Sequence, residues 1–136
     1  MRFGAVLAVL AVLVVRTKSA FAEGCPAKSS QMDDVVAALN DARGCDRAMQ
    51  VFDACAFGAS GDVRLGAVAE KKCEADFVNR LKVPQNRIYQ RELSACDRKY
   101  EHRSGTLYLS FAAFCRAEVA QHYAHQAQKA AGAGAR

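Results

Sequence analysis

The stretch CDRKYEHRSGTLYLSFAAFC, residues 96–115, decides the fold because two cysteines flank a polar break at nearly equal distances. The mean position of Cys96 and Cys115 is 105.5, which falls on the tripeptide SGT at 104–106. Apolar residues recur at helical spacing on both sides of this break. Residues equally far from the turn face each other in an antiparallel helix pair. The stretch therefore predicts a helical hairpin closed by a Cys96–Cys115 disulfide.

The other four cysteines are paired by the same geometry. Cys45 and Cys55 lie ten residues apart on one expected helix, which is roughly 15 Å along the helix axis. A disulfide requires Cα atoms within roughly 7 Å, so these two cysteines cannot pair. Cys45 and Cys73 average to position 59, inside the turn sequence FGASG, and are expected to face each other. Cys25 and Cys55 remain, so this third pair rests partly on elimination.

Turn and capping signals divide the chain into about five short helices. Their expected starts lie at or just after Ser30, Cys45, Asp62, Pro84 and Thr106. Three of these residues, the serine, the aspartate and the threonine, have N-cap chemistry, and proline suits a first helical turn.

The expected helix ends and core positions complete this reading. Gly44 is expected just past the end of the first helix, as a C′ residue, and the third helix is expected to run to about Leu81. Phe77, Ile88 and Phe111 are among the residues expected to face the core. No alternating strand pattern was found, so the sequence predicts an all-α domain of antiparallel helix hairpins stapled by disulfides.

The first residues, MRFGAVLAVLAVLVVRTKSAFAEG, have the form of a secretory signal peptide. The apolar run 3–15 spans roughly 20 Å, too short for a bilayer core of about 30 Å. It leads to the A-x-A signature at 20–22, which places the cut between Ala22 and Glu23. Two basic residues close to this cut leave an uncleaved anchor as the alternative. We expect residues 1–22 to be removed, and no membrane span to remain afterwards.

Removal of the signal peptide changes the charge of the protein. The whole chain has 19 basic and 14 acidic residues. Arg2, Arg16 and Lys18 leave with the signal, so 16 basic residues face 14 acidic ones, a net charge of about +2. Nucleic-acid binding therefore loses its main support, and no nucleic-acid partner is expected.

The mature chain is expected to form one domain over residues 23–127, followed by a flexible, Ala/Gly-rich tail over 128–136. Its six cysteines, an even number in a small exported domain, are typical of three structural disulfides. No C-x-x-C pair occurs, which argues against a metal site and against a redox-active pair.

The residues that carry chemistry form no catalytic or metal-binding set. His122 and His125 share a helix face, but no third ligand accompanies them. Asp97 and Glu101 have the spacing of an ordinary solvated helix face. Motifs for nucleophilic, zinc-dependent or phosphate chemistry are absent from the sequence. We therefore expect no enzyme activity and no cofactor.

Three arginines, Arg87, Arg91 and Arg98, fall on one face of the expected fourth helix. Such a stripe can contact anionic lipids, cell-wall polymers or nucleic acids. No aromatic residues interleave the stripe in a stacking pattern. We therefore interpret it as a solvated helix face.

The segment 85–116 resembles the LprI-type lysozyme inhibitor domain of bacterial exported proteins. In that family a glutamine is followed by an aromatic residue, a cysteine, a Gly-Gly-Ser/Thr loop and a second cysteine. Here Gln85 is followed by Tyr89, Cys96 lies eleven residues after Gln85, and Cys115 lies ten residues after Gly105. Tyrosine stands where tryptophan is usual, and serine replaces the first glycine of the loop.

The resemblance implies an exported binding protein of the bacterial envelope, periplasmic or secreted, that acts by steric occlusion. The implied partner is a lysozyme (muramidase) or another envelope component. The hairpin tip, with Gly105, Thr106 and Tyr108, is the expected contact surface. Two alternatives stay open: an envelope structural or stress protein, and a saposin-like lipid-binding protein.

Overall fold

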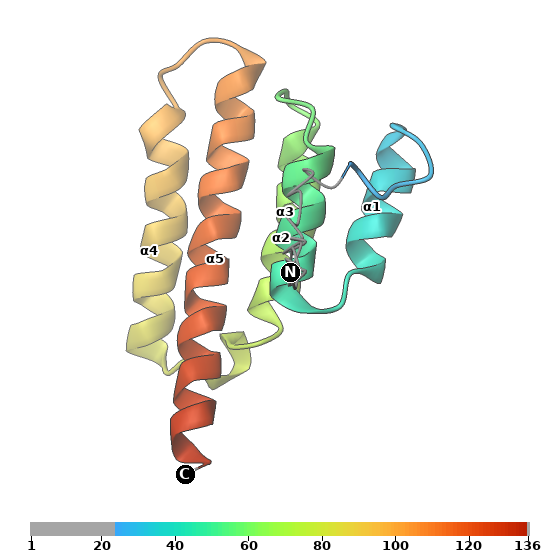
Figure 1. The fold of residues 1–136 in the computed structure, drawn as a ribbon. Helices are drawn as coiled ribbons and strands as arrows, with labels where there is room; N and C mark the ends of the chain where they lie inside the picture. Colours follow the sequence, from blue (N-terminus) through green and yellow to red (C-terminus); the bar gives the residue numbers. More distant parts are fainter. Residues whose placement is uncertain (1–23, 136) are drawn as a thin grey trace, which may run out of the picture.

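In the computed structural model, which describes residues 24–135, all regular structure is helical (Figure 1). The elements are α1 (Met32–Asp41), α2 (Gly44–Cys55), α3 (Asp62–Glu74), the 3₁₀ turn η1 (Val78–Arg80), α4 (Val83–Tyr100) and α5 (Thr106–Gly134). The predicted all-α fold with disulfide staples is confirmed. The predicted signal peptide and its cut lie outside the described residues.

α5, the longest helix, packs against three other helices, while α1 packs mainly against α2 and α3. Figure 1 shows α4 and α5 as an antiparallel pair on one side of the molecule, α2 and α3 in the middle, and α1 on the other side. α5 contacts α2, α3 and α4, and α4 packs mainly against α5. The largest fully buried side chains are Tyr89, Phe52, Leu39, Leu65 and Val35. The core therefore receives residues from the first four α-helices, and α5 covers it.

Small residues let α3 and α5 approach closely. Ala113, Ala117, Ala120 and Ala124 are all buried along α5. A Cβ atom placed on Gly66 of α3 would lie 2.9 Å from the Cβ atom of Ala113. At this point the two helices approach so closely that only small side chains fit between them.

Three disulfides join the helices, and all six cysteines take part. They are Cys25–Cys55, Cys45–Cys73 and Cys96–Cys115, with Cα–Cα distances of 4.7, 4.3 and 5.6 Å. Helix geometry predicts the second and third of these pairs, and Cys25–Cys55 is the pair predicted partly by elimination. The last one joins α4 to α5, and the second joins α2 to α3.

The three predicted side-chain caps were wrong. Gln31, not Ser30, is the N-cap of α1, and Gly105, not Thr106, is the N-cap of α5. Asp62 is the first residue of α3 rather than its cap. Its carboxylate accepts a hydrogen bond from the backbone N–H of Phe57 in the preceding loop. Gly44, predicted to end the first helix, begins α2 with a φ of +80°.

Two further expectations about helix length differ from the structure. α3 ends at Glu74, and the chain then turns through η1 before α4 instead of continuing as helix to Leu81. α5 continues as helix to Gly134, through most of the segment predicted to be a tail. The flexibility of residues 128–136 itself stays a prediction.

Candidate functional site

The loop between α4 and α5 forms an exposed tip at one end of the bundle. Gly105 and Thr106 are exposed, whereas Tyr108 is half-buried. Gly105 has a φ of +105°, a conformation that favours glycine. The chain thus reverses sharply at this residue and enters α5 without a side-chain cap.

An aromatic cluster holds the two ends of this loop together. Tyr108 stacks on Tyr100 at the end of α4, with ring centroids 6.3 Å apart, and meets Phe111 edge-on at 5.9 Å. The guanidinium of Arg103 lies 5.8 Å from the ring centroid of Tyr108, in cation–π geometry. The half-burial of Tyr108 follows from these contacts, and the loop is held from both sides.

Large apolar side chains, Val63 and Leu109 among them, are exposed at this end, and we call three of them the apolar tip. They are Phe57, Leu107 and Phe111, with exposed fractions of 43%, 47% and 41%. Leu107 and Phe111 are one turn apart and share a face of α5. Phe57 belongs to the α2–α3 loop, and a Cβ atom on the next residue, Gly58, would lie 3.9 Å from Leu107. The prediction that Phe111 faces the core was wrong.

A buried carboxylate fixes the α2–α3 loop to α5. Asp62 is fully buried and accepts hydrogen bonds from the backbone N–H groups of Phe57 and Gly58, at 2.8 and 2.9 Å. The Ser110 hydroxyl donates to the same carboxylate at 2.6 Å. Because Ser110 lies between Leu107 and Phe111 on α5, this one carboxylate sets the loop relative to the helix. The apolar tip is therefore preorganised.

A second polar network lies between α3, α4 and α5. The Arg116 guanidinium on α5 donates two hydrogen bonds to Glu70, at 3.0 and 3.1 Å, and one to Asp97 at 2.9 Å. Burial raises the pKa of Glu70, and the hydrogen bonds from Arg116 oppose this rise. Asp97 was interpreted as part of a solvated face, but it pairs with this arginine. The network ties three helices together.

Substitution Arg116→Met is expected to destabilise the fold by about 1–2 kcal/mol near pH 7, because Glu70 then stays buried without its cation. Loss of the arginine raises the pKa of Glu70 further. A raised pKa favours the protonated form in the fold, so stability is lost as pH rises through that pKa and regained below the unfolded value of about 4.3. The deficit should therefore shrink toward pH ~4, as measured by urea unfolding.

The double variant Glu70→Gln/Arg116→Met is the control for this pH dependence. It removes the titrating carboxylate, so its deficit relative to Glu70→Gln should change little over the same pH range. An equal pH dependence in both variants would contradict the assignment to Glu70.

The two histidines on α5 have separate partners. His125 contacts the Asp46 carboxylate on α2 at 2.6 Å, and His122 pairs with Gln126 at 2.9 Å. Hydrogen bonds from Gln121 and then His125 lower the pKa of Asp46. Within residues 24–135, no cluster of histidine, cysteine and carboxylate side chains has the arrangement of a metal site.

The arginine stripe lies where the sequence places it. Arg87, Arg91 and Arg98 are exposed together on the outer face of α4 and line one shallow depression.

Among the helices of residues 24–135, none is both long enough and apolar enough to span a bilayer.

Sequence reasoning found the tip loop but missed most of its apolar surface. Phe57 lies in a segment that was interpreted only as a turn, and Leu107 was not singled out. Two signals in the sequence are available. One is an apolar side chain beside a glycine in a turn, and the other is a set of apolar residues in the first turn of a helix. Neither signal separates exposure from burial without the positions of the neighbouring helices.

No family model, curated protein or solved structure matches this chain.

Proposed function

We propose that this protein is an exported, non-enzymatic binding protein of the bacterial envelope that inhibits a lysozyme by steric occlusion. The observation that carries the proposal is the apolar tip. Its three side chains are exposed at one end of the molecule, on a surface fixed by Asp62 and by the aromatic cluster. The resemblance of residues 85–116 to LprI-type inhibitors supports the choice of a muramidase as partner.

The three disulfides support the proposed route of export. Disulfides persist in oxidising compartments such as the periplasm and the extracellular space, and are rare in the cytosol. We propose that the chain is delivered there by the signal peptide, cut between Ala22 and Glu23, to the periplasm or the medium.

Preorganisation explains how a small apolar surface can bind an enzyme cleft. Binding usually orders side chains and loops at an interface, which costs about 0.5–1.5 kcal/mol per side chain. Here the α2–α3 loop and the start of α5 are already held by the Asp62–Ser110 hydrogen bond and by ring packing. Aromatic side chains such as Phe57 and Phe111 also contribute strongly to interfaces when they fill a pocket.

The experiment that tests the proposal is a muramidase assay with the mature protein. Hydrolysis of peptidoglycan is measured with lysozymes of several types, with the inhibitor in micromolar excess. At least one lysozyme type is expected to slow in a dose-dependent manner. Unchanged turnover with every type would refute the proposal.

The double variant Leu107→Asp/Phe111→Asp is expected to raise the concentration for half-inhibition at least tenfold, since about 1.4 kcal/mol corresponds to that factor. Two carboxylates would have to be desolvated in the cleft. Val83→Asp is the matched control, because Val83 is 67% exposed at the start of α4 and away from the tip. Equal inhibition by the tip variant and the control would show that the tip is not the contact surface.

A further inference from the structure

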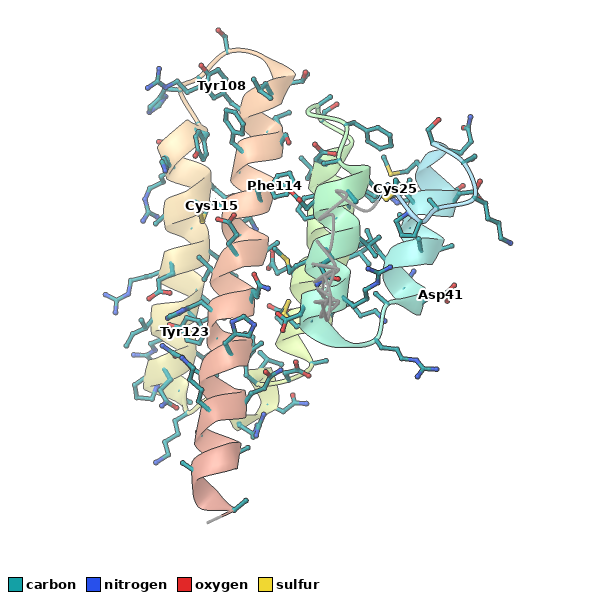
Figure 2. The ribbon with its side chains drawn as sticks, in the orientation of Figure 1. Cys25, Asp41, Tyr108, Phe114, Cys115 and Tyr123 are labelled. Atoms are coloured by element: carbon teal, nitrogen blue, oxygen red, sulfur yellow. A yellow bond between two sulfur atoms is a disulfide. The ribbon has the colours of Figure 1, made fainter. Side chains whose placement is uncertain are left out.

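A groove of about 640 Å³ lies along the C-terminal half of α5, between η1 and the start of α4. Its floor is aromatic: Phe77 is buried, and its ring centroid lies 5.5 Å from that of Tyr123. Figure 2 shows Tyr123 on the half of α5 opposite to Tyr108. The groove is therefore separate from the apolar tip, and no sequence motif pointed to it.

The walls of the groove are mostly apolar, with Gln85 and Gln126 as the uncharged polar residues that line it. Ala127, Ala130 and Ala131 line one side with small side chains of α5. Leu81 and Ile88 line the opposite side, and Ile88 is 44% exposed, although the sequence predicted it in the core. Because the alanine side chains are small, they leave an open space between α5 and the larger side chains of Leu81 and Ile88. The volume falls within the roughly 300–1,000 Å³ of small-molecule sites.

The charged groups around the groove are unevenly placed. Arg80 lines it and donates a hydrogen bond to the carbonyl of Asp76. A guanidinium has five N–H donors, so this one bond positions the group and leaves capacity for a bidentate carboxylate. Burial raises the pKa of Tyr123, and the nearby Glu92 carboxylate raises it further. The cation thus comes from η1, and the anion comes from α4.

We propose that this groove binds a medium-chain fatty acid, with the alkyl chain along the Phe77–Tyr123 floor and the carboxylate on Arg80. The apolar lining matches an alkyl chain, and the arginine selects an anionic head group. One arginine in a groove of this volume matches a single carboxylate chain. This activity is independent of the proposed inhibition of a lysozyme.

The test is a calorimetric titration of the mature protein with laurate below its critical micelle concentration. Saturable binding of one laurate per chain is expected. Dodecyltrimethylammonium, which has a chain of nearly the same length with the opposite charge, should bind at least tenfold more weakly, because its head group cannot accept a hydrogen bond from the Arg80 guanidinium. Lack of saturable laurate binding overturns the proposal. Binding to anionic phospholipid vesicles without binding of monomeric laurate also overturns it.

Two variants separate the alkyl site from the head-group site. Ala130→Phe fills the groove from an exposed position and should abolish laurate binding, with an unchanged melting temperature as the check on folding. Arg80→Gln should weaken laurate binding about tenfold while dodecanol binding is retained. Lys129→Gln removes an exposed α5 cation that does not line the groove, and it should bind laurate as the wild type does. Full laurate binding by Ala130→Phe, or equal losses in Arg80→Gln and Lys129→Gln, overturns the assignment.

Discussion

Reduction of the three disulfides is expected to unfold the protein at room temperature. The bridges span 30, 28 and 19 residues. In the chain-entropy model each loop of this length stabilises the fold by about 3–4 kcal/mol, and three together by about 10 kcal/mol. Domains of this size have a total stability of about 5–15 kcal/mol. Opening the three bridges therefore removes most of the free energy of unfolding.

The measurement is far-UV circular dichroism and a thermal melt of the protein after reduction and alkylation. Four of the cysteines are nearly or fully buried, so reduction is carried out in denaturant before transfer to buffer. The double variant Cys96→Ala/Cys115→Ala, which opens the shortest loop, serves as the graded control and should lose about 3 kcal/mol while remaining folded. A cooperative melt of the fully reduced chain would show that the core is sufficient alone.

Substitution Asp62→Asn is expected to destabilise the protein by about 2–4 kcal/mol, the largest loss from any single change considered. The carboxylate accepts hydrogen bonds from two loop N–H groups at 2.8 and 2.9 Å and from Ser110 at 2.6 Å. An amide of the same shape keeps one acceptor oxygen and turns an NH₂ group toward donors. It also loses the favourable charge at the start of α3.

The matched control is Asp53→Asn, an exposed carboxylate on α2. Its free energy of unfolding should change by less than about 0.5 kcal/mol. Urea unfolding compares the two variants, and equal midpoints would contradict the role given to Asp62. Because the carboxylate also positions Phe57, the same variant should weaken muramidase inhibition at temperatures where it is still folded.

The disulfide pairs were predictable because helix geometry leaves few choices. Cys96 and Cys115 lie at equal distances from a polar break, and two residues related in this way face each other across a hairpin. Cys45 and Cys55 are excluded from pairing by the rise of one helix. These arguments use only spacing and the length of a disulfide, so they do not depend on the packing of side chains.

The helix ends were less predictable because backbone and tertiary effects outweigh local capping chemistry. Phe77 and Leu81 continue the apolar spacing of α3, which favours a longer helix. In the structure the helix ends at Glu74, because the chain must cross from α3 to the start of α4, and η1 makes that crossing. At the start of α5, Gly105 adopts a positive φ. The capping chemistry of Thr106, which was the basis of the prediction, gives no indication of this backbone conformation.

The candidate sites depended on contacts that are distant in sequence. Asp62 and Ser110 are 48 residues apart. Nothing in the sequence around either residue indicates that the other is its hydrogen-bond partner. Phe111 has the spacing of a core residue, but α5 reaches the end of the bundle there and leaves the ring 41% exposed. The groove likewise forms only where η1, α4 and α5 meet.

The disulfides fall into two groups, and no disulfide joins the first three helices to the last two. Cys25–Cys55 and Cys45–Cys73 cross-link the part with α1, α2 and α3, while Cys96–Cys115 cross-links only α4 to α5. Among residues 24–135, no bridge connects these two parts, so the segment between α3 and α4 is their only covalent link. The contact between α3 and α5 is therefore held by packing, hydrogen bonds and an ion pair, and by no disulfide. A protease cut at that segment would leave two fragments held by noncovalent contacts alone, and two opened copies could exchange their α4–α5 hairpins, the geometry of a domain-swapped dimer.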